Sequence, residues 1–333
     1  CDGRHVGSAQ HWSGPGHRLR HRASRVLLRN IEIQRADQFH RTRGLSLFSA
    51  LLDRFLLLRP RWLPMILFIP VLYGLGWLMA SVLIPLGLPN GSVSLVGTLL
   101  SFLSFLIVMP RWVQRRWQRK DYWVVLGILP SHGQAWNVPL IALLRGLIMA
   151  AGLLGLVTIP ILLNGWGTWR GDWSLATTIN ALILCLGVGV AEEIIFRAWL
   201  LKELNNFTSR FGAVVSQAFV FSVVHTRFNL GLAPMLGLLT GLFLLGMTLA
   251  MQRHHDHGSL WGCIGMHGGL VGGWFLLSHG LLDLSKASAL YVGFPATDPN
   301  PLSGLIAITA FSLLFIWQWQ SLQRINRPES RIL

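Results

Sequence analysis

Two adjacent carboxylates interrupt an otherwise apolar stretch of the chain, which reads AEEIIFR over residues 191–197. A charged group at bilayer depth costs at least about 2.5 kcal/mol and by default marks a functional site. Glu193 and Arg197 are four residues apart, so they share a helix face and can pair. Glu192 is turned about 100° away from that face and has no local cation. Glu192 is therefore a candidate general base; the alternative is a charged group near a helix end that reaches water.

His225 and His267 lie in two later apolar runs. The turn near residues 206–208 begins about 12 residues after Glu192 and ends about 15 residues before His225. At about 1.5 Å per residue, both side chains lie about 18–22 Å from that turn on antiparallel neighbours and can face each other. His267 lies about 13 Å into a run rich in glycine. Three small-xxx-small pairs there allow a neighbouring helix to approach closely: Gly265/Gly269, Gly268/Gly272 and Gly269/Gly273.

A glutamate and two histidines at one depth suit the hydrolysis of an amide. That reaction needs a general base, a positioned water and donors for the developing oxyanion. The same three residues, Glu192, His225 and His267, could instead ligate a divalent metal such as zinc. The sequence contains no HExxH motif, so a metal-assisted and a glutamate-only mechanism both stay open. The simpler alternatives are a hydrogen-bonded histidine at a span end for His225 and a packing role for His267.

The elements that must position these groups are membrane-spanning helices. Hydrophobic residues make up 52% of the chain and charged residues 12%, against about 25% charged in soluble domains. Eight apolar runs approach the length of about 20 residues that a spanning helix needs. Lysine and arginine gather in alternate loops, which predicts that both termini are cytoplasmic. We therefore expect an all-α, polytopic integral membrane bundle of about eight transmembrane helices, at 63–87, 92–110, 138–163, 174–201, 211–228, 231–251, 259–280 and 302–321.

Three parts follow along the chain. Residues 1–60 are predicted to be a basic tail, disordered to about residue 43, with a short interfacial helix after it. Residues 61–322 form the predicted transmembrane bundle, with a core at 174–280, and residues 323–333 form a cytoplasmic tail. Cys1 stands where an initiator Met is expected, which indicates a fragment or a misassigned start.

The formal net charge of +15 lies largely in the N-terminal tail and the short loops. That distribution favours topology control and an anionic leaflet over nucleic acid. We expect membrane lipid as a partner and no nucleic acid. Arg145 lies inside a predicted span and is expected to pair with a carboxylate or a lipid phosphate. The His254–His257 tract is expected to carry charge on the cytoplasmic side rather than to bind metal.

Three ordered motifs carry a family resemblance. Glu192-Glu193-x-x-x-Arg197, then Phe221-x-x-x-His225, then His267 in a glycine-rich span resemble those of the CPBP intramembrane metalloproteases, which include CAAX prenyl proteases and lysostaphin-resistance-like proteins. The resemblance covers roughly residues 174–280. It implies an intramembrane endopeptidase acting on a membrane-associated, in some members lipidated, protein or peptide. It also implies a bacterial plasma membrane or a plastid membrane as the location.

The resemblance assigns a role to each motif residue. Glu192 would activate the water, with Glu193 and Arg197 in support. His225 would orient the water, and His267 would bind the oxyanion. The third motif departs from the family, because Val271 stands at the fourth position after His267, where Asn or Asp is usual.

Two other functions stay open, the first of them because of this departure. One is a non-catalytic membrane scaffold or immunity factor of the same fold. The other is a proton-coupled transporter that uses the buried carboxylates as a relay.

Overall fold

The computed structural model describes residues 47, 49–131, 133–295 and 299–325. The chain divides into two compact units, Cys1–Pro64 and Met65–Leu333, each described by itself. In the first unit, residues 49–56 are helical, within the short helix expected after the basic tail. The predicted disordered tail itself lies outside the described residues. The division of the chain into an N-terminal tail, a transmembrane bundle and a C-terminal tail remains a prediction.

The described chain is nearly all helix. The helices are α2 (Leu63–Val82), α3 (Val93–Arg116), α4 (Tyr122–Val125), α5 (Val138–Leu163), α6 (Leu175–Glu192), η3 (Glu193–Leu200), α7 (Leu201–Leu204), α8 (Arg210–Val223), α9 (Leu232–His255), α10 (Trp261–Leu276), η4 (Leu277–Leu281), α11 (Ala289–Val292) and α12 (Leu305–Ile325). Here η3 and η4 are π-helical. Short 3₁₀ turns occupy Ile84–Leu86, Asn90–Ser92 and Pro301–Ser303. Two-residue strands, β1 (Thr168–Trp169) and β2 (Leu282–Asp283), pair antiparallel and join the α5–α6 connection to the end of η4.

The protein is an integral membrane protein with an all-α polytopic fold. Within the described residues, six helices are long and apolar enough to cross a bilayer. They are Leu63–Leu86, Asn90–Arg116, Val138–Leu163, Leu175–Leu204, Leu232–His255 and Leu305–Arg324. The other two predicted spans, 211–228 and 259–280, correspond to the shorter helices α8 and α10, the latter continued by η4. The count of eight and the cytoplasmic termini therefore stay predictions.

Local sequence signals set where the site helices begin. The Ser174 hydroxyl accepts a hydrogen bond from the Thr177 backbone N–H and caps α6. Ser209 caps α8 in the same way, accepting from the N–H of Gly212. These two caps fix the start of the helices that bring Glu192 and the region of His225 to the site.

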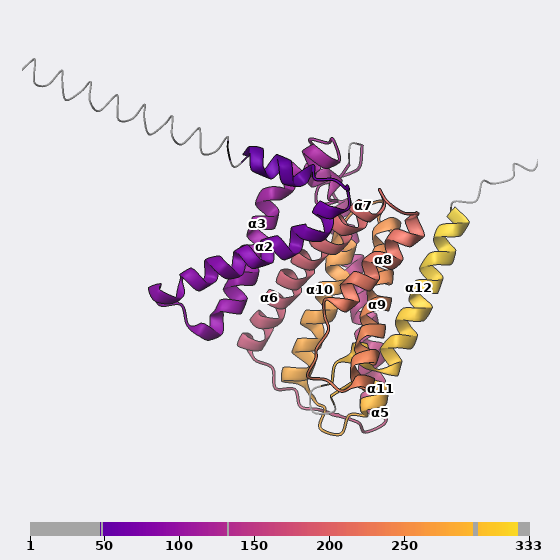
Figure 1. Ribbon diagram of the computed structural model, residues 1–333. Helices are drawn as coiled ribbons and strands as arrows, with labels where there is room; N and C mark the ends of the chain where they lie inside the picture. The colour runs from indigo at the N-terminus through magenta and orange to yellow at the C-terminus, as the bar shows by residue number, and fades with distance from the viewer. Residues whose placement is uncertain (1–46, 48, 132, 296–298, 326–333) are drawn as a thin grey trace, which may run out of the picture. The chain divides into compact units, whose positions relative to one another are not determined.

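Helix α10 packs closely against both α5 and α6 through its glycines (Figure 1). A Cβ at Gly268 would collide with the Cys185 carbonyl oxygen on α6, and one at Gly265 with the Leu143 carbonyl oxygen on α5. From the other side, a Cβ at Gly189 would lie 3.0 Å from the Cα of Gly268. The predicted role of the small-xxx-small pairs is thus confirmed, and it holds α10 at backbone contact with α6.

This close packing predicts the effect of a larger side chain. We expect Gly268→Val to lower the free energy of unfolding by about 1–3 kcal/mol, because α6 and α10 would have to separate. Equilibrium unfolding in mixed micelles measures the change. Gly187→Val is the matched control, since nothing lies within 4 Å of a Cβ at that α6 position. Equal effects of the two substitutions would contradict the packing argument.

A polar cluster closes one end of the bundle. Asp256, only 3% exposed, forms an ion pair with Arg145 and accepts a hydrogen bond of 2.9 Å from Gln252. Gln318 on α12 donates to the same glutamine at 3.1 Å. The sequence predicted either a carboxylate or a lipid phosphate as the partner of Arg145, and the structure shows a carboxylate. The His-rich tract contributes that carboxylate to the packed end of the bundle rather than presenting it in a loop.

Candidate active site

Glu192 and Glu193 lie at the junction of α6 and η3. The π-helix that begins at Glu193 has i→i+5 hydrogen bonds, and such segments occur often at functional sites. The two neighbouring carboxylates end in different surroundings. Glu193 is fully buried, whereas 26% of the Glu192 side chain is exposed. One carboxylate is thus part of the packed interior, and the other belongs to a partly exposed side chain.

Glu193 is the centre of a buried polar network. Its Oε1 accepts hydrogen bonds from Arg197 Nη1 at 2.8 Å and from His267 Nδ1 at 2.7 Å. Arg197 is also fully buried, and its guanidinium lies 4.1 Å from the centre of the Phe221 ring. The Arg197 cation, the Glu193 carboxylate and the Phe221 ring together fix the orientation of the His267 imidazole. Functional histidines are commonly oriented in this way by a carboxylate that accepts a hydrogen bond from one ring nitrogen.

The two histidines present the same nitrogen to Glu192. Nδ1 of His225 lies 2.7 Å from the Phe221 carbonyl oxygen, which can only accept, so this nitrogen donates. Nδ1 of His267 donates to Glu193. Each Nε2 then faces Glu192 Oε2, at 3.5 Å from His225 and 3.9 Å from His267. When both rings are neutral, three acceptor atoms surround one point, which suits a water molecule or a cation, and protonation of His267 would turn its Nε2 into a donor.

His225 lies just beyond α8 rather than within it. The helix ends at Val223, and the His225 backbone N–H bonds to the Ser222 carbonyl oxygen in the turn that follows. The predicted match in depth between Glu192 and His225 is nevertheless confirmed by their contact. All five predicted site residues meet in one network.

The three acceptors line the wall of a cavity of about 500 Å³. Most of its other walls are apolar, with leucines from α5, α6, α9 and α10 and the rings of Phe221, Trp274, Phe275 and Phe311. Val271 also lines it, one helical turn after His267, and brings no hydrogen-bond donor. The cavity has several polar side chains in a predominantly apolar lining, the general form of a site for small molecules or extended chains.

Two carboxamides in this cavity were missed from the sequence. Asn229, in the α8–α9 connection, and Asn300, before the last 3₁₀ turn, both line it. Asn229 is the fourth residue after His225, the spacing that the family uses after its last histidine. That spacing was the one available signal. No pattern indicated Asn300, because it comes from a distant loop.

The donor set suits zinc, but the side chains do not enclose an ion as they stand. Oxygen and imidazole nitrogen are ordinary zinc ligands, and Nδ1 of each histidine already has the acceptor that zinc-bound histidines have. Among the described residues, no group of three His, Cys, Asp or Glu side chains is placed to hold a metal. Glu192, His225 and His267 are the residues that would hold it, and zinc stays a prediction.

The part of the chain that contains this site matches a known protein family. Residues 173–273 match the family described as Type II CAAX prenyl endopeptidase Rce1-like. The chain carries an Rce1-like domain. The domain begins just before α6 and ends within α10, so it contains Glu192, Glu193, Arg197, His225 and His267. The resemblance to the CAAX proteases is confirmed over this stretch.

A second match lies outside the Rce1-like domain. Residues 40–121 match a domain of unknown function, DUF8676. No curated protein and no solved structure matches the chain. The Rce1-like domain thus supports a peptidase of the CAAX-protease type, and the roles of individual residues rest on the geometry above.

Proposed function

We propose that the protein is an intramembrane endopeptidase that hydrolyses a peptide bond in a membrane-associated protein or peptide, lipid-modified ones included. One observation carries the proposal. Glu192 Oε2 faces Nε2 of both His225 and His267 at 3.5 and 3.9 Å, at the wall of a largely apolar cavity. The proposed location is a bacterial plasma membrane or a plastid membrane.

The proposed reaction begins with a water between Glu192 and His225. Glu192 takes a proton from this water, and the hydroxide oxygen forms a bond to the carbonyl carbon of the substrate. His225 Nε2 accepts a hydrogen bond from the other O–H of the water and so orients the attack. The C–N bond then breaks, and the proton held by Glu192 passes to the leaving amine.

His267 is the proposed partner of the oxyanion in this reaction. Its Nε2 can donate to the oxyanion only when that nitrogen carries a proton. A ring protonated on both nitrogens forms an ion pair with Glu193 at Nδ1, at the 2.7 Å contact already present. Glu193 and Arg197 therefore act by positioning His267 rather than by touching the substrate.

The cavity lining supports a substrate with an apolar portion. The leucines and aromatic rings bury an extended hydrocarbon or a run of apolar side chains at about 25 cal/mol per Å² of covered surface. The test is cleavage by purified protein in liposomes, with one fluorogenic peptide supplied in prenylated and unmodified forms. Cleavage of the prenylated form alone would assign the lipidated class. Equal cleavage would assign apolar peptides, and no cleavage of any membrane peptide would contradict the proposal.

Zinc can be tested separately from the fold. Metal content per chain, measured by mass spectrometry, is compared between the wild-type protein and His225→Ala. One equivalent of zinc that is lost in the variant would establish the metal-assisted route. Cleavage that persists in fully metal-free protein would establish that Glu192 activates water alone. When bound, zinc would supply Lewis acidity to the water.

Val271 gives a prediction of increased activity. Val271→Asn would place a carboxamide at the cavity wall one turn from His267, where it can donate to the oxyanion. We expect kcat to rise about ten-fold, because a single oxyanion donor is commonly worth more than that. Val271→Leu is the control of similar size without a donor. An unchanged or lower kcat with intact folding would show that another group, such as Asn229, already fills this role.

Val271 is also the observation that favours a second candidate, a non-catalytic scaffold or immunity factor with the same fold. In that case substitution of the site would leave the cellular phenotype intact. Complementation of a deletion strain with site variants therefore separates the two functions.

A further inference from the structure

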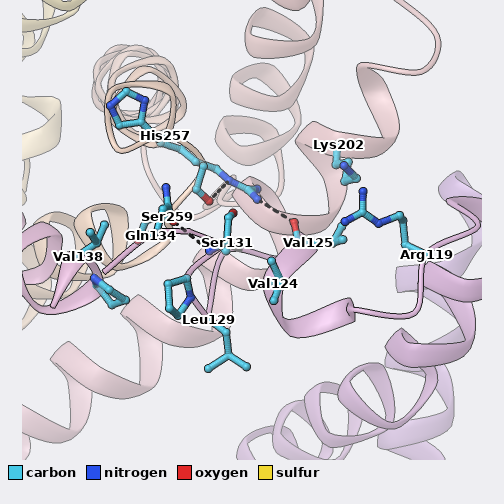
Figure 2. Close-up of a pocket in the computed structure, with 15 residues that line it drawn as sticks. Arg119, Val124, Val125, Leu129, Ser131, Gln134, Val138, Lys202, His257 and Ser259 are labelled. Carbon is cyan, nitrogen blue, oxygen red and sulfur yellow. Dashed lines mark hydrogen bonds between the residues drawn. The ribbon is translucent and has the colours of Figure 1, made fainter. Parts of the chain in front are cut away.

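A second pocket lies apart from the cavity of the proposed active site, at the end of the bundle where α7 and α9 finish and α5 and α10 begin (Figure 2). Its volume is about 280 Å³. Its walls come from the segment after α3, from α4 and the loop that follows it, from Lys202, and from the α9–α10 turn. Nothing in the peptidase mechanism uses it.

Several cationic side chains line the pocket. Arg119, Lys202 and Arg253 line it together with His257, and among the residues that the structure describes no aspartate or glutamate lines it, although Arg119 pairs with Asp121 beside it. Arg253 is 9% exposed and donates to backbone carbonyl oxygens, those of Leu126 at 3.2 Å and Arg197 among them. The Arg253 guanidinium is thus held by the dipoles of backbone carbonyl groups rather than by an ion pair with a carboxylate.

Two cations converge at one end of this pocket. Figure 2 shows the Lys202 ammonium and the Arg119 guanidinium directed toward each other. Arg119 uses Nε and Nη2 to bind Asp121, which leaves Nη1 as a donor. The Lys202 ammonium lies 5.3 Å from the centre of the Trp117 ring. The two like charges repel each other, and an anion bound between them would be attracted by both.

The pocket walls are already fixed. The backbone N–H of Leu260 donates to the Gly127 carbonyl oxygen at 2.9 Å, and the Trp261 indole donates to the Ile128 carbonyl oxygen at 2.8 Å. Gly127 has φ +83°, and a Cβ there would collide with the Gly258 carbonyl oxygen. The loop after α4 is therefore docked on the α9–α10 turn, and an anion would enter a preorganised site.

We propose that this pocket binds the phosphate group of an anionic phospholipid. Phosphate is the anion that clustered arginine and lysine side chains bind at close range. The lipid source is favoured by the exposed apolar side chains beside the pocket. Leu129, which lines it, is 42% exposed, and Trp123 and Trp136 nearby in the chain are 36% and 79% exposed. Basic pockets between helix ends on the cytoplasmic side are typical sites for anionic headgroups. The proposal is independent of the peptidase function.

The test measures lipid binding to the full-length protein in detergent by native mass spectrometry. Phosphatidylglycerol is compared with phosphatidylcholine of the same chain length, and inorganic phosphate is added as a competitor. We expect Arg119→Gln and Lys202→Gln each to weaken phosphatidylglycerol binding about five-fold, and the double variant about 25-fold. Lys120→Gln is the matched control, because Lys120 is exposed, adjacent in sequence, and does not line the pocket.

Each outcome of the binding measurement either supports or overturns the proposed lipid site. Loss in the pocket variants alone, with phosphatidylcholine bound weakly throughout, supports the lipid site. Displacement of phosphatidylglycerol by millimolar inorganic phosphate would assign the pocket to free phosphate and overturn the lipid source. Equal loss in Lys120→Gln would reduce the effect to general surface charge and overturn the site. Circular dichroism on each variant verifies that the helices are retained.

Discussion

Glu192→Gln is expected to reduce peptide cleavage by about 10²–10⁴-fold, the range that a general base contributes. The amide keeps the size of the carboxylate but cannot take a proton from the water. The substitution introduces no charge, and the Glu192 side chain is partly exposed. The fold should persist, and the loss should appear in kcat with little change in KM.

The measurement is steady-state cleavage by purified protein in liposomes, with the unfolding transition recorded alongside. Asp172→Asn is the matched control, since Asp172 is 63% exposed, pairs with an exposed arginine and does not line the cavity. It should leave kcat unchanged. Wild-type activity in Glu192→Gln would remove the basis of the proposed mechanism. Lost activity together with lost helical structure would require the smaller change Glu192→Asp to separate the two effects.

Glu193→Gln is expected to destabilise the protein by about 3–5 kcal/mol. The ion pair with Arg197 is fully buried on both sides, so removing the carboxylate leaves an uncompensated guanidinium in the interior. His267 loses its charged acceptor in the same step, and cleavage should fall with stability. Unfolding in mixed micelles gives the change in free energy.

A double variant separates stability from chemistry. Glu193→Leu with Arg197→Met replaces the buried pair by apolar side chains, which commonly restores much of the lost stability. Cleavage should not return, because His267 Nδ1 still lacks its carboxylate. Arg170→Gln, which breaks the exposed pair with Asp172, is the control and should cost under about 1 kcal/mol. If Glu193→Gln cost as little as Arg170→Gln, the buried network would not be holding the site.

The site could be predicted from the sequence because helices convert residue counts into depth. Glu192 and His225 lie at similar distances from one turn, and the glycines around His267 allow backbone contact. Scarce charge in an apolar chain also identified Glu193 and Arg197 without structural help. These inferences use only helix geometry and the cost of charge in lipid.

Other features depend on tertiary contacts that no local pattern contains. Arg145 and Asp256 are 111 positions apart, and nothing near either residue specifies the other. The π-helical form of η3 is not visible in the residues 193–200, which an ordinary α-helix would accept equally well. The basic pocket joins three separate segments, so its charges appear in the sequence as unrelated loop residues.

The π-helical segment η3 gives the protein an unusual response to a change in chain length. Each of its i→i+5 turns holds one residue more than an α-helical turn, so η3 is equivalent to an ordinary helix that has absorbed an insertion. Deleting one residue between Glu193 and Arg197 would let the segment narrow locally, with α6 and α7 kept in place. Because residues three apart in an α-helix still share a face, Arg197 would keep Glu193 within reach while the rest of the bundle stayed folded.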